Sequence, residues 1–292
     1  MLKKILLPLV AALSLGCIAA SAQTIKTLED SKYSISAGDL TMTVDAGKGA
    51  KILSFQYKGK EVLSQLQRPN AFGSTFWTSP QSEWNWPPVP EYDTRPYTAE
   101  QKNGTLVLTG EESARYHYRI RKEFRPAGNC IEVTYSIINE ASVERKIAPW
   151  EISRVPSEGV IFFDATPETI TPIGLLPITF ENEGSWYQVD EARANRKINA
   201  DGAGWYAYAH DGLLLVKRFE DIDGTQPAPR EAEIQVYVNA GKTFIELEAQ
   251  GPYTSLKPGE ALSWTVCWYL LPQECGETPS QGLMDLVKSV VK

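Results

Sequence analysis

Acidic and amide side chains beside tryptophans supply most of the chemistry that this sequence of 292 residues could perform. Glu248 and Gln250 occupy alternate positions of segment 244–250, so a strand would place both on one face. Glu151 follows Trp150, and burial beside an aromatic ring can raise the pKa of a carboxyl group enough for acid–base catalysis. The candidate catalytic residues are Glu248 as base or nucleophile, with Glu151 and His210 as possible acid partners.

A tryptophan- and proline-rich segment, residues 72–97, predicts a long ordered loop, because proline cannot donate a hydrogen bond within a central strand ladder. Aromatic rings can cover the apolar face of a sugar, while amides and carboxylates bind its hydroxyl groups. The candidate sugar-binding residues are Trp77, Gln81, Glu83, Trp84, Trp86, Trp150 and Gln250. The same composition also fits a plug that closes one end of a β sandwich, and both interpretations stay open.

The motifs of nucleotide, zinc and serine-hydrolase chemistry are absent from the sequence. There is no phosphate-binding loop and no Gly-x-Ser-x-Gly segment. The chain's two histidines, His117 and His210, lie far apart and without the spacing of a zinc site. We therefore expect neither a metal ion nor a cofactor.

The first 22 residues have the pattern of a secretory signal peptide. Two lysines precede an apolar stretch, residues 5–15, and Ala20-Ser21-Ala22 resembles a cleavage site. The apolar stretch is too short to anchor the chain across a membrane. We expect residues 23–292 to form a periplasmic or secreted protein. Lipid attachment at Cys17 is the less favoured alternative, because the residue three positions before it is a serine.

Charge and cysteine content restrict the partners and the covalent links. Cleavage after residue 22 would remove two of the 29 basic residues and leave 27 − 36 = −9. A surface this acidic repels nucleic acid and anionic membranes, so we expect the protein to bind neither. We also expect a monomer. Cys130 and Cys267 lie in apolar segments and are expected to be buried free thiols, although a bridge between Cys267 and Cys275 is an alternative.

The elements that must position these side chains are mostly strands. Polar and apolar residues alternate in segments such as 130–137 and 262–268, and turn pairs such as Asn103-Gly104 separate them. This pattern predicts an all-β, single-domain antiparallel β supersandwich rich in hairpins. Residues 181–204 look irregular, while apolar residues between 283 and 291 recur at the spacing of a short C-terminal helix.

Several short motifs are spread along the chain: Gly49-Ala50-Lys51-Ile52-Leu53-Ser54-Phe55, Gly59-Lys60-Glu61-Val62-Leu63, Tyr135-Ser136-Ile137-Ile138-Asn139, Ala148-Pro149-Trp150-Glu151, Glu248-Ala249-Gln250, Leu256-x-Pro258-Gly259-Glu260 and Trp264. Together they resemble the galactose mutarotase-like (aldose 1-epimerase) superfamily, in an exported and uncharacterised bacterial branch. The resemblance spans nearly all of residues 23–292. It implies a β supersandwich whose concave sheet binds a carbohydrate.

The resemblance also implies roles for single residues. Mutarotases use a glutamate of a Glu-x-Gln segment as the base, and Glu248 matches it. A histidine supplies the acid in that family, but Trp150-Glu151 stands where it is expected, so simple mutarotation is not implied.

We therefore expect an exported carbohydrate-binding protein. The alternatives are a sugar-active enzyme, epimerase-like or glycosidase-like, with Glu248 as base or nucleophile, and an interaction protein whose concave face contacts a partner chain.

Overall fold

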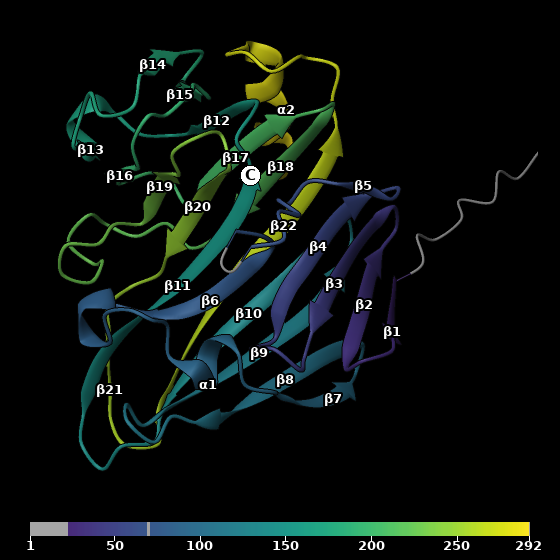
Figure 1. The fold of residues 1–292 in the computed structure, drawn as a ribbon, viewed down its shortest axis with the longest axis vertical. Helices are drawn as coiled ribbons and strands as arrows, with labels where there is room; N and C mark the ends of the chain where they lie inside the picture. Colours follow the sequence, from purple (N-terminus) through teal and green to yellow (C-terminus); the bar gives the residue numbers. More distant parts are fainter. Residues whose placement is uncertain (1–22, 69–70, 292) are drawn as a thin grey trace, which may run out of the picture.

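The computed structural model describes residues 23–68 and 71–291, whose strands form two large antiparallel sheets (Figure 1). The prediction of an all-β fold with a short C-terminal helix is confirmed. The predicted signal peptide, with Cys17, lies outside the described residues. Within those residues, no helix is both long enough and apolar enough to cross a membrane.

The twelve-stranded sheet joins the N-terminal hairpins to strands from the middle and the end of the chain. Its main order is β1 (Gln23–Thr27), β2 (Lys32–Ala37), β3 (Leu40–Asp45), β4 (Lys51–Tyr57), β6 (Ser74–Ser79), β11 (Arg145–Pro156), β20 (Phe244–Gln250), β19 (Ile234–Val238), β16 (Arg196–Ala200) and β13 (Ile170–Thr171). Beside this path, β5 (Lys60–Glu61) pairs with β4, and β21 (Thr254–Leu256) pairs with β11. The sheet thereby brings β6, β11 and β20 together from distant parts of the sequence.

The ten-stranded sheet packs against the first one. Its order is β14 (Ile178–Glu181), β15 (Gly184–Gln188), β12 (Val160–Phe163), β17 (Trp205–His210), β18 (Leu213–Arg218), β22 (Ala261–Pro272), β10 (Cys130–Asn139), β9 (Tyr118–Ala127), β8 (Thr105–Glu112) and β7 (Thr98–Lys102). The helices are η1 (Gln81–Glu83), α1 (Pro90–Asp93), η2 (Pro167–Thr169) and α2 (Gln281–Val291).

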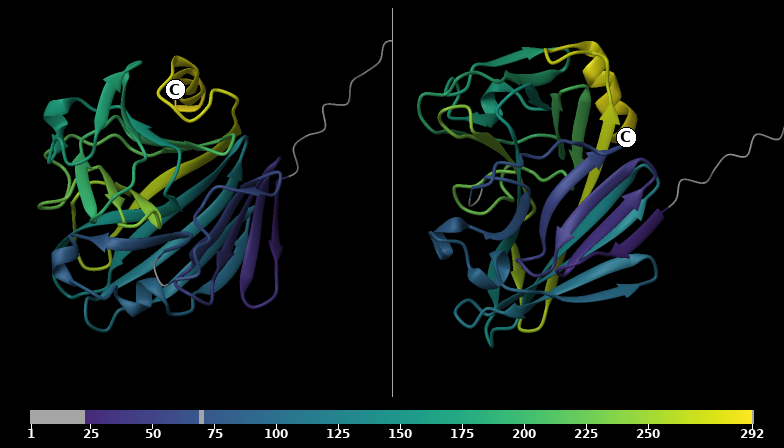
Figure 2. Two further views of the ribbon diagram at one scale, coloured as in Figure 1. Left: turned by 45° about the horizontal axis from the view of Figure 1, so that its top comes forward. Right: turned by 45° about the vertical axis from the view of Figure 1, so that its right-hand side comes forward.

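The main core lies between the two sheets, where β2, β3 and β4 contact β9, β10 and β22 (Figures 1 and 2). Alternate residues of each strand point into this layer, so the apolar positions of the period-two pattern become the core. Phe55 of β4 meets Trp268 of β22 edge to face, with 5.4 Å between ring centroids. Burial of such aromatic pairs is a main source of the stability of this sandwich.

A second, smaller core lies beneath α2, on the other side of the ten-stranded sheet (Figure 2). Leu283, Met284 and Val287 form the buried face of this helix. They belong to the same apolar cluster as Phe162 and Trp186, whose rings stack with 4.1 Å between centroids. The amphipathic spacing predicted for this segment therefore buries one stripe of the helix.

Two segments expected to be irregular contain strands. The prolines of segment 72–97 all follow residue 79, so the β-branched and aromatic residues before them are free to form β6. Residues 181–204 likewise contain β15 and β16, with Trp186 packed in the second core. In both segments tertiary packing prevails over the local loop signals.

Candidate functional site

The two acidic candidates, Glu151 and Glu248, lie on the neighbouring strands β11 and β20 but point to opposite sides of the sheet. In the strand register Glu248 lies opposite Ile152, while Glu151 lies opposite Ala249. Glu151 contacts Lys217 of the ten-stranded sheet, so its side chain faces the layer between the sheets. Glu248 therefore faces away from that layer, on what we call the outward face of the twelve-stranded sheet. The fold does not bring these two carboxylates together.

Glu248 is almost completely buried although it lies on the outward face. Its Oε2 accepts a hydrogen bond from Trp150 Nε1 at 2.8 Å and another from Lys197 Nζ at 2.9 Å. Burial raises the pKa of the Glu248 carboxyl group, and the charge of Lys197 offsets part of that shift. The Lys197 side chain is 35% exposed. One member of this ion pair is therefore within reach of a ligand.

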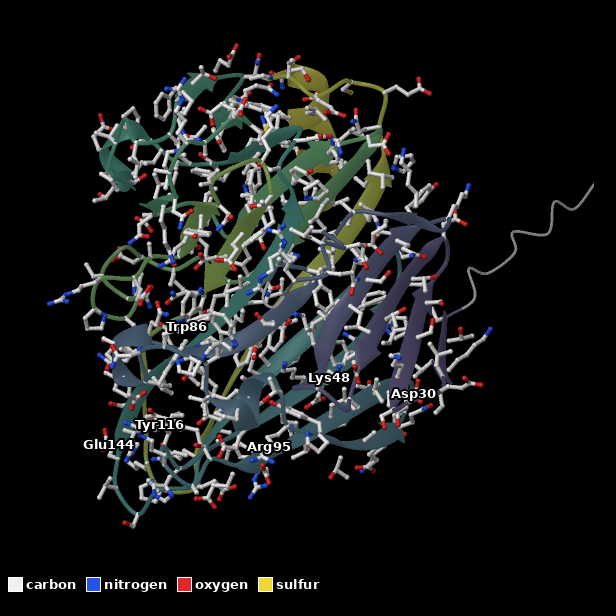
Figure 3. All side chains as sticks on the ribbon, in the orientation of Figure 1. Asp30, Lys48, Trp86, Arg95, Tyr116 and Glu144 are labelled. Atoms are coloured by element: carbon white, nitrogen blue, oxygen red, sulfur yellow. The ribbon has the colours of Figure 1, made fainter. Side chains whose placement is uncertain are left out.

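Four tryptophans gather beside this ion pair. The Trp77 ring meets those of Trp84, Trp86 and Trp150 edge to face, with 5.7, 6.1 and 5.5 Å between centroids. Three of the four are buried, whereas Trp86 is 61% exposed and lies on the segment that follows β6 (Figure 3). The predicted aromatic cluster thus forms a packed wall with one ring open to solvent.

Two glutamines of the outward face leave hydrogen-bonding capacity unused. Gln235 lies opposite Glu248 in the register, and Gln250 lies two residues further along the same strand. Their Nε2 groups donate to Glu231 at 2.8 and 3.1 Å, so one carboxylate fixes both amides. Among the described residues, neither buried Oε1 atom has a hydrogen-bond partner. A ligand hydroxyl would satisfy such an acceptor at no cost to existing protein contacts.

A buried arginine presents a free donor on the same face. Arg154 of β11 is fully buried, and it hydrogen-bonds to Glu246 through Nε at 3.0 Å and to Thr75 through Nη1 at 3.0 Å. Its Nη2 atom has no partner within the described part of the chain. The pKa of Lys51, at the start of β4, is lowered to about 8. Burial is the larger cause, and the positive charge of the nearby Arg154 is the second. The outward face thus carries donors as well as acceptors.

A cavity of about 440 Å³ opens at the edge of the outward face. Its lining includes Asn199 of β16 and Glu231, which also holds the two glutamines. Asn199 lies opposite Gln235, which in turn lies opposite Glu248, so these three side chains share one row. This volume lies within the range of small-molecule pockets.

The remaining candidates are divided between the rim and a distant strand end. The Gln81 backbone N–H donates to Glu231 at 3.3 Å, which places Gln81 beside the glutamines. Glu83 lies 3.7 Å from Arg145, and burial raises the pKa of the Glu83 carboxyl group.

His210 lies at the end of β17 in the other sheet. It contacts Glu158 and Glu277 instead of Glu248.

Four polar residues of this site were not predicted from the sequence: Arg154, Lys197, Glu231 and Gln235. Arg154 was detectable, because it lies on the same strand face as Trp150 at a spacing of four residues. Lys197 was hidden in a segment that looked irregular. Glu231 lies in a loop, and only the tertiary structure brings it to the glutamines.

Comparisons with solved structures identify the architecture. An Escherichia coli K12 protein provisionally described as an aldose 1-epimerase matches with a TM-score of 0.59 and 15% identity, over 86% of this chain and 100% of that one. A galactose mutarotase-like protein from Lactobacillus casei matches with a TM-score of 0.55 and 12% identity, over 82% and 100% of the two chains. The chain has the galactose mutarotase-like fold. No protein-family model and no curated sequence matches it.

A third structure with this mutarotase-like fold is a galactose mutarotase related enzyme from Lactobacillus acidophilus. It aligns with a TM-score of 0.58 and 10% identity, over 85% of this chain and 100% of the other. The predicted superfamily resemblance is thereby confirmed at the level of fold. At such low identity, the roles of individual residues must be argued from the geometry of this chain.

Proposed function

We propose that the outward face binds a carbohydrate, and that Gln235, Gln250 and Arg154 contact its hydroxyl groups. The observation that carries this proposal is the set of unpartnered buried polar atoms on these three side chains. Two acceptors and one donor match the mixed hydrogen-bonding capacity of a sugar. Buried polar groups without partners cost free energy, which a bound sugar would recover.

The surroundings of these atoms support a sugar rather than a partner protein. The tryptophan wall supplies apolar surface, the exposed Trp86 ring lies on its rim, and the adjacent cavity is of small-molecule size. We further propose that the mature chain, residues 23–292, acts outside the cytoplasm.

A binding screen tests this proposal directly. Titration calorimetry against neutral and acidic mono- and oligosaccharides should detect at least one ligand, with affinity reduced about tenfold or more in Gln235→Leu and in Gln250→Leu. Gln101→Leu, on exposed strand β7, is the matched control and should leave affinity unchanged. Equal loss in all three variants, or binding by none of the proteins to any sugar, would refute the assignment.

A second candidate, sugar epimerisation, is favoured by the contact between Lys197 and Glu248. A carboxyl group with a raised pKa beside an ammonium group forms an acid–base pair. Glu248 would accept the proton of the anomeric hydroxyl while Lys197 protonates the ring oxygen, so that the ring C–O bond breaks. Closure of the aldehyde on its other face, with both protons returned, would give the second anomer.

The rate of anomer interconversion, followed by NMR, separates this candidate from simple binding. Catalysis should disappear in both Glu248→Gln and Lys197→Met, while sugar binding, although weakened, stays measurable. Lys257→Met, an exposed turn residue, is the control. Rates equal to the uncatalysed reaction in the unmodified protein, with binding intact, would exclude the enzymatic role for the sugars tested.

A further inference from the structure

A cluster of soft metal-ligating groups lies on the ten-stranded sheet, on the face that α2 covers. Cys130 begins β10, and Cys267 lies in the neighbouring strand β22, directly opposite Glu132. The two Sγ atoms and a Glu132 carboxylate oxygen all lie within 4.8 Å of one another. This is the one group of three such ligands found among the described residues.

The spacing of these atoms suits a metal ion. Zinc-bound thiolates lie about 2.3 Å from the metal, so two ligands of a tetrahedral site are about 3.8 Å apart. Both cysteines are free thiols in the structure. Because β10 and β22 are paired in the interior of the sheet, the strand register fixes the backbone positions of the three residues.

The surroundings contain the features of a supported site. Arg125 forms an ion pair with the Glu132 carboxylate, and second partners of this kind orient ligating carboxylates. The cluster is accessible, since Cys267 is half-buried and the Glu132 side chain is 25% exposed. Apolar residues near the end of α2, including Val290 and Val291, pack on the same core as Cys130 and Cys267.

We propose that Cys130, Cys267 and Glu132 bind a thiophilic d¹⁰ cation such as Zn²⁺ or Cd²⁺, with a fourth coordination position open to water. Two thiolates and one carboxylate form a donor set that selects soft cations over Mg²⁺ or Ca²⁺. The bound ion would cross-link two strands of the sheet. This site lies in the other sheet from Glu248, so it is independent of the proposed sugar-binding function.

Cadmium titration of the full, reduced chain provides the test. Thiolate-to-metal charge-transfer absorbance in the ultraviolet, together with equilibrium dialysis, should show one tightly bound Cd²⁺ per chain. The control is Cys17→Ser/Cys275→Ser, which removes the two cysteines that the proposed donor set does not use and should retain that equivalent. Cys130→Ser and Cys267→Ser should each weaken binding about 100-fold or more, and Glu132→Gln about tenfold, with thermal unfolding in metal-free buffer confirming that the variants fold.

Three results would overturn the proposal. The first is unchanged Cd²⁺ affinity in both single cysteine variants, and the second is loss of the bound equivalent in the control. The third is the absence of tight Cd²⁺ binding by the unmodified chain after reduction. This result counts against the proposal even if Cys130 and Cys267 are found as a disulfide before reduction.

Discussion

Two lysine–glutamate pairs lie on opposite faces of the twelve-stranded sheet, with their glutamates on the neighbouring strands β11 and β20, and their surroundings differ. Between the sheets, Lys217 Nζ lies 2.7 and 2.8 Å from the two carboxylate oxygens of Glu151, and both side chains are fully buried. On the outward face, Lys197 Nζ lies 2.9 Å from Glu248, and the lysine is partly exposed.

The inner pair is closed by additional hydrogen bonds, whereas the outer pair lies among unsatisfied groups. Ser74, Ser153 and Tyr206 also donate to Glu151. Near Glu248, in contrast, Gln235 and Gln250 each keep a free acceptor. A saturated buried pair has no capacity left for a ligand, while an unsaturated one does. The same chemical pair is therefore structural on one face and available for binding on the other.

Breaking the inner pair should have the largest effect on stability. Glu151→Gln leaves Lys217 without its countercharge between the sheets and should lower the free energy of unfolding by about 3–5 kcal/mol. Chemical denaturation measures this loss. In Glu151→Gln/Lys217→Met, much of it should be recovered. Additive losses in the double variant would show that the two charges are not coupled.

A third buried carboxyl group, that of Glu233, has no lysine partner among the described residues, and it should make stability depend on pH. Glu233 accepts backbone hydrogen bonds from Gly202 at 2.8 Å and Ile222 at 3.2 Å, yet burial raises its pKa to about 7. The folded protein then binds a proton more tightly than the unfolded chain. Protonation of Glu233 therefore stabilises the folded state by at most on the order of 3 kcal/mol. This contribution to the free energy of unfolding is fully present below about pH 4.5 and is lost as the pH rises through about 7.

Denaturation of Glu233→Gln between pH 5 and 8, beside the unmodified chain, checks this contribution. The variant should show a flatter dependence of stability on pH across that window. Parallel curves for the two proteins would mean that Glu233 titrates at the same pH in the folded and unfolded states.

Changing the outer pair should affect ligand binding more than stability. Glu248→Gln keeps the shape of the side chain, and Lys197 can turn to solvent, so the loss of stability should stay near 1 kcal/mol. Loss of the charged acceptor should weaken sugar binding about tenfold in calorimetry. A stability loss as large as that of Glu151→Gln would remove the distinction between the two faces.

The smallest effect is expected at His210, which ends β17 and forms ion-pair contacts with neither pair. Its acidic partners are open to solvent, since the side chain of Glu158 is 68% exposed and that of Glu277 is 37% exposed. His210→Gln should change stability by less than about 1 kcal/mol and leave sugar affinity unchanged. A clear loss of binding or turnover would return this histidine to the candidate site.

Local sequence patterns were sufficient for the fold class and for part of the site. Alternation predicted the strands that became β10, β20 and β22, and helical spacing predicted α2. Proximity of Trp77, Trp84 and Trp86 in sequence placed them in one cluster. Segment 72–97 was misread at its start, because proline signals beyond residue 79 masked the strand β6.

The sequence by itself determined the side-chain alternation of each strand, and hence that Glu248 and Gln250 share a face. Only the tertiary structure decided that Glu151 faces the other sheet, that Lys197 pairs with Glu248, and that Glu231 holds both glutamines. The reason is physical: periodicity fixes relative orientation within one strand, whereas contacts between strands depend on register and on loops that join distant segments.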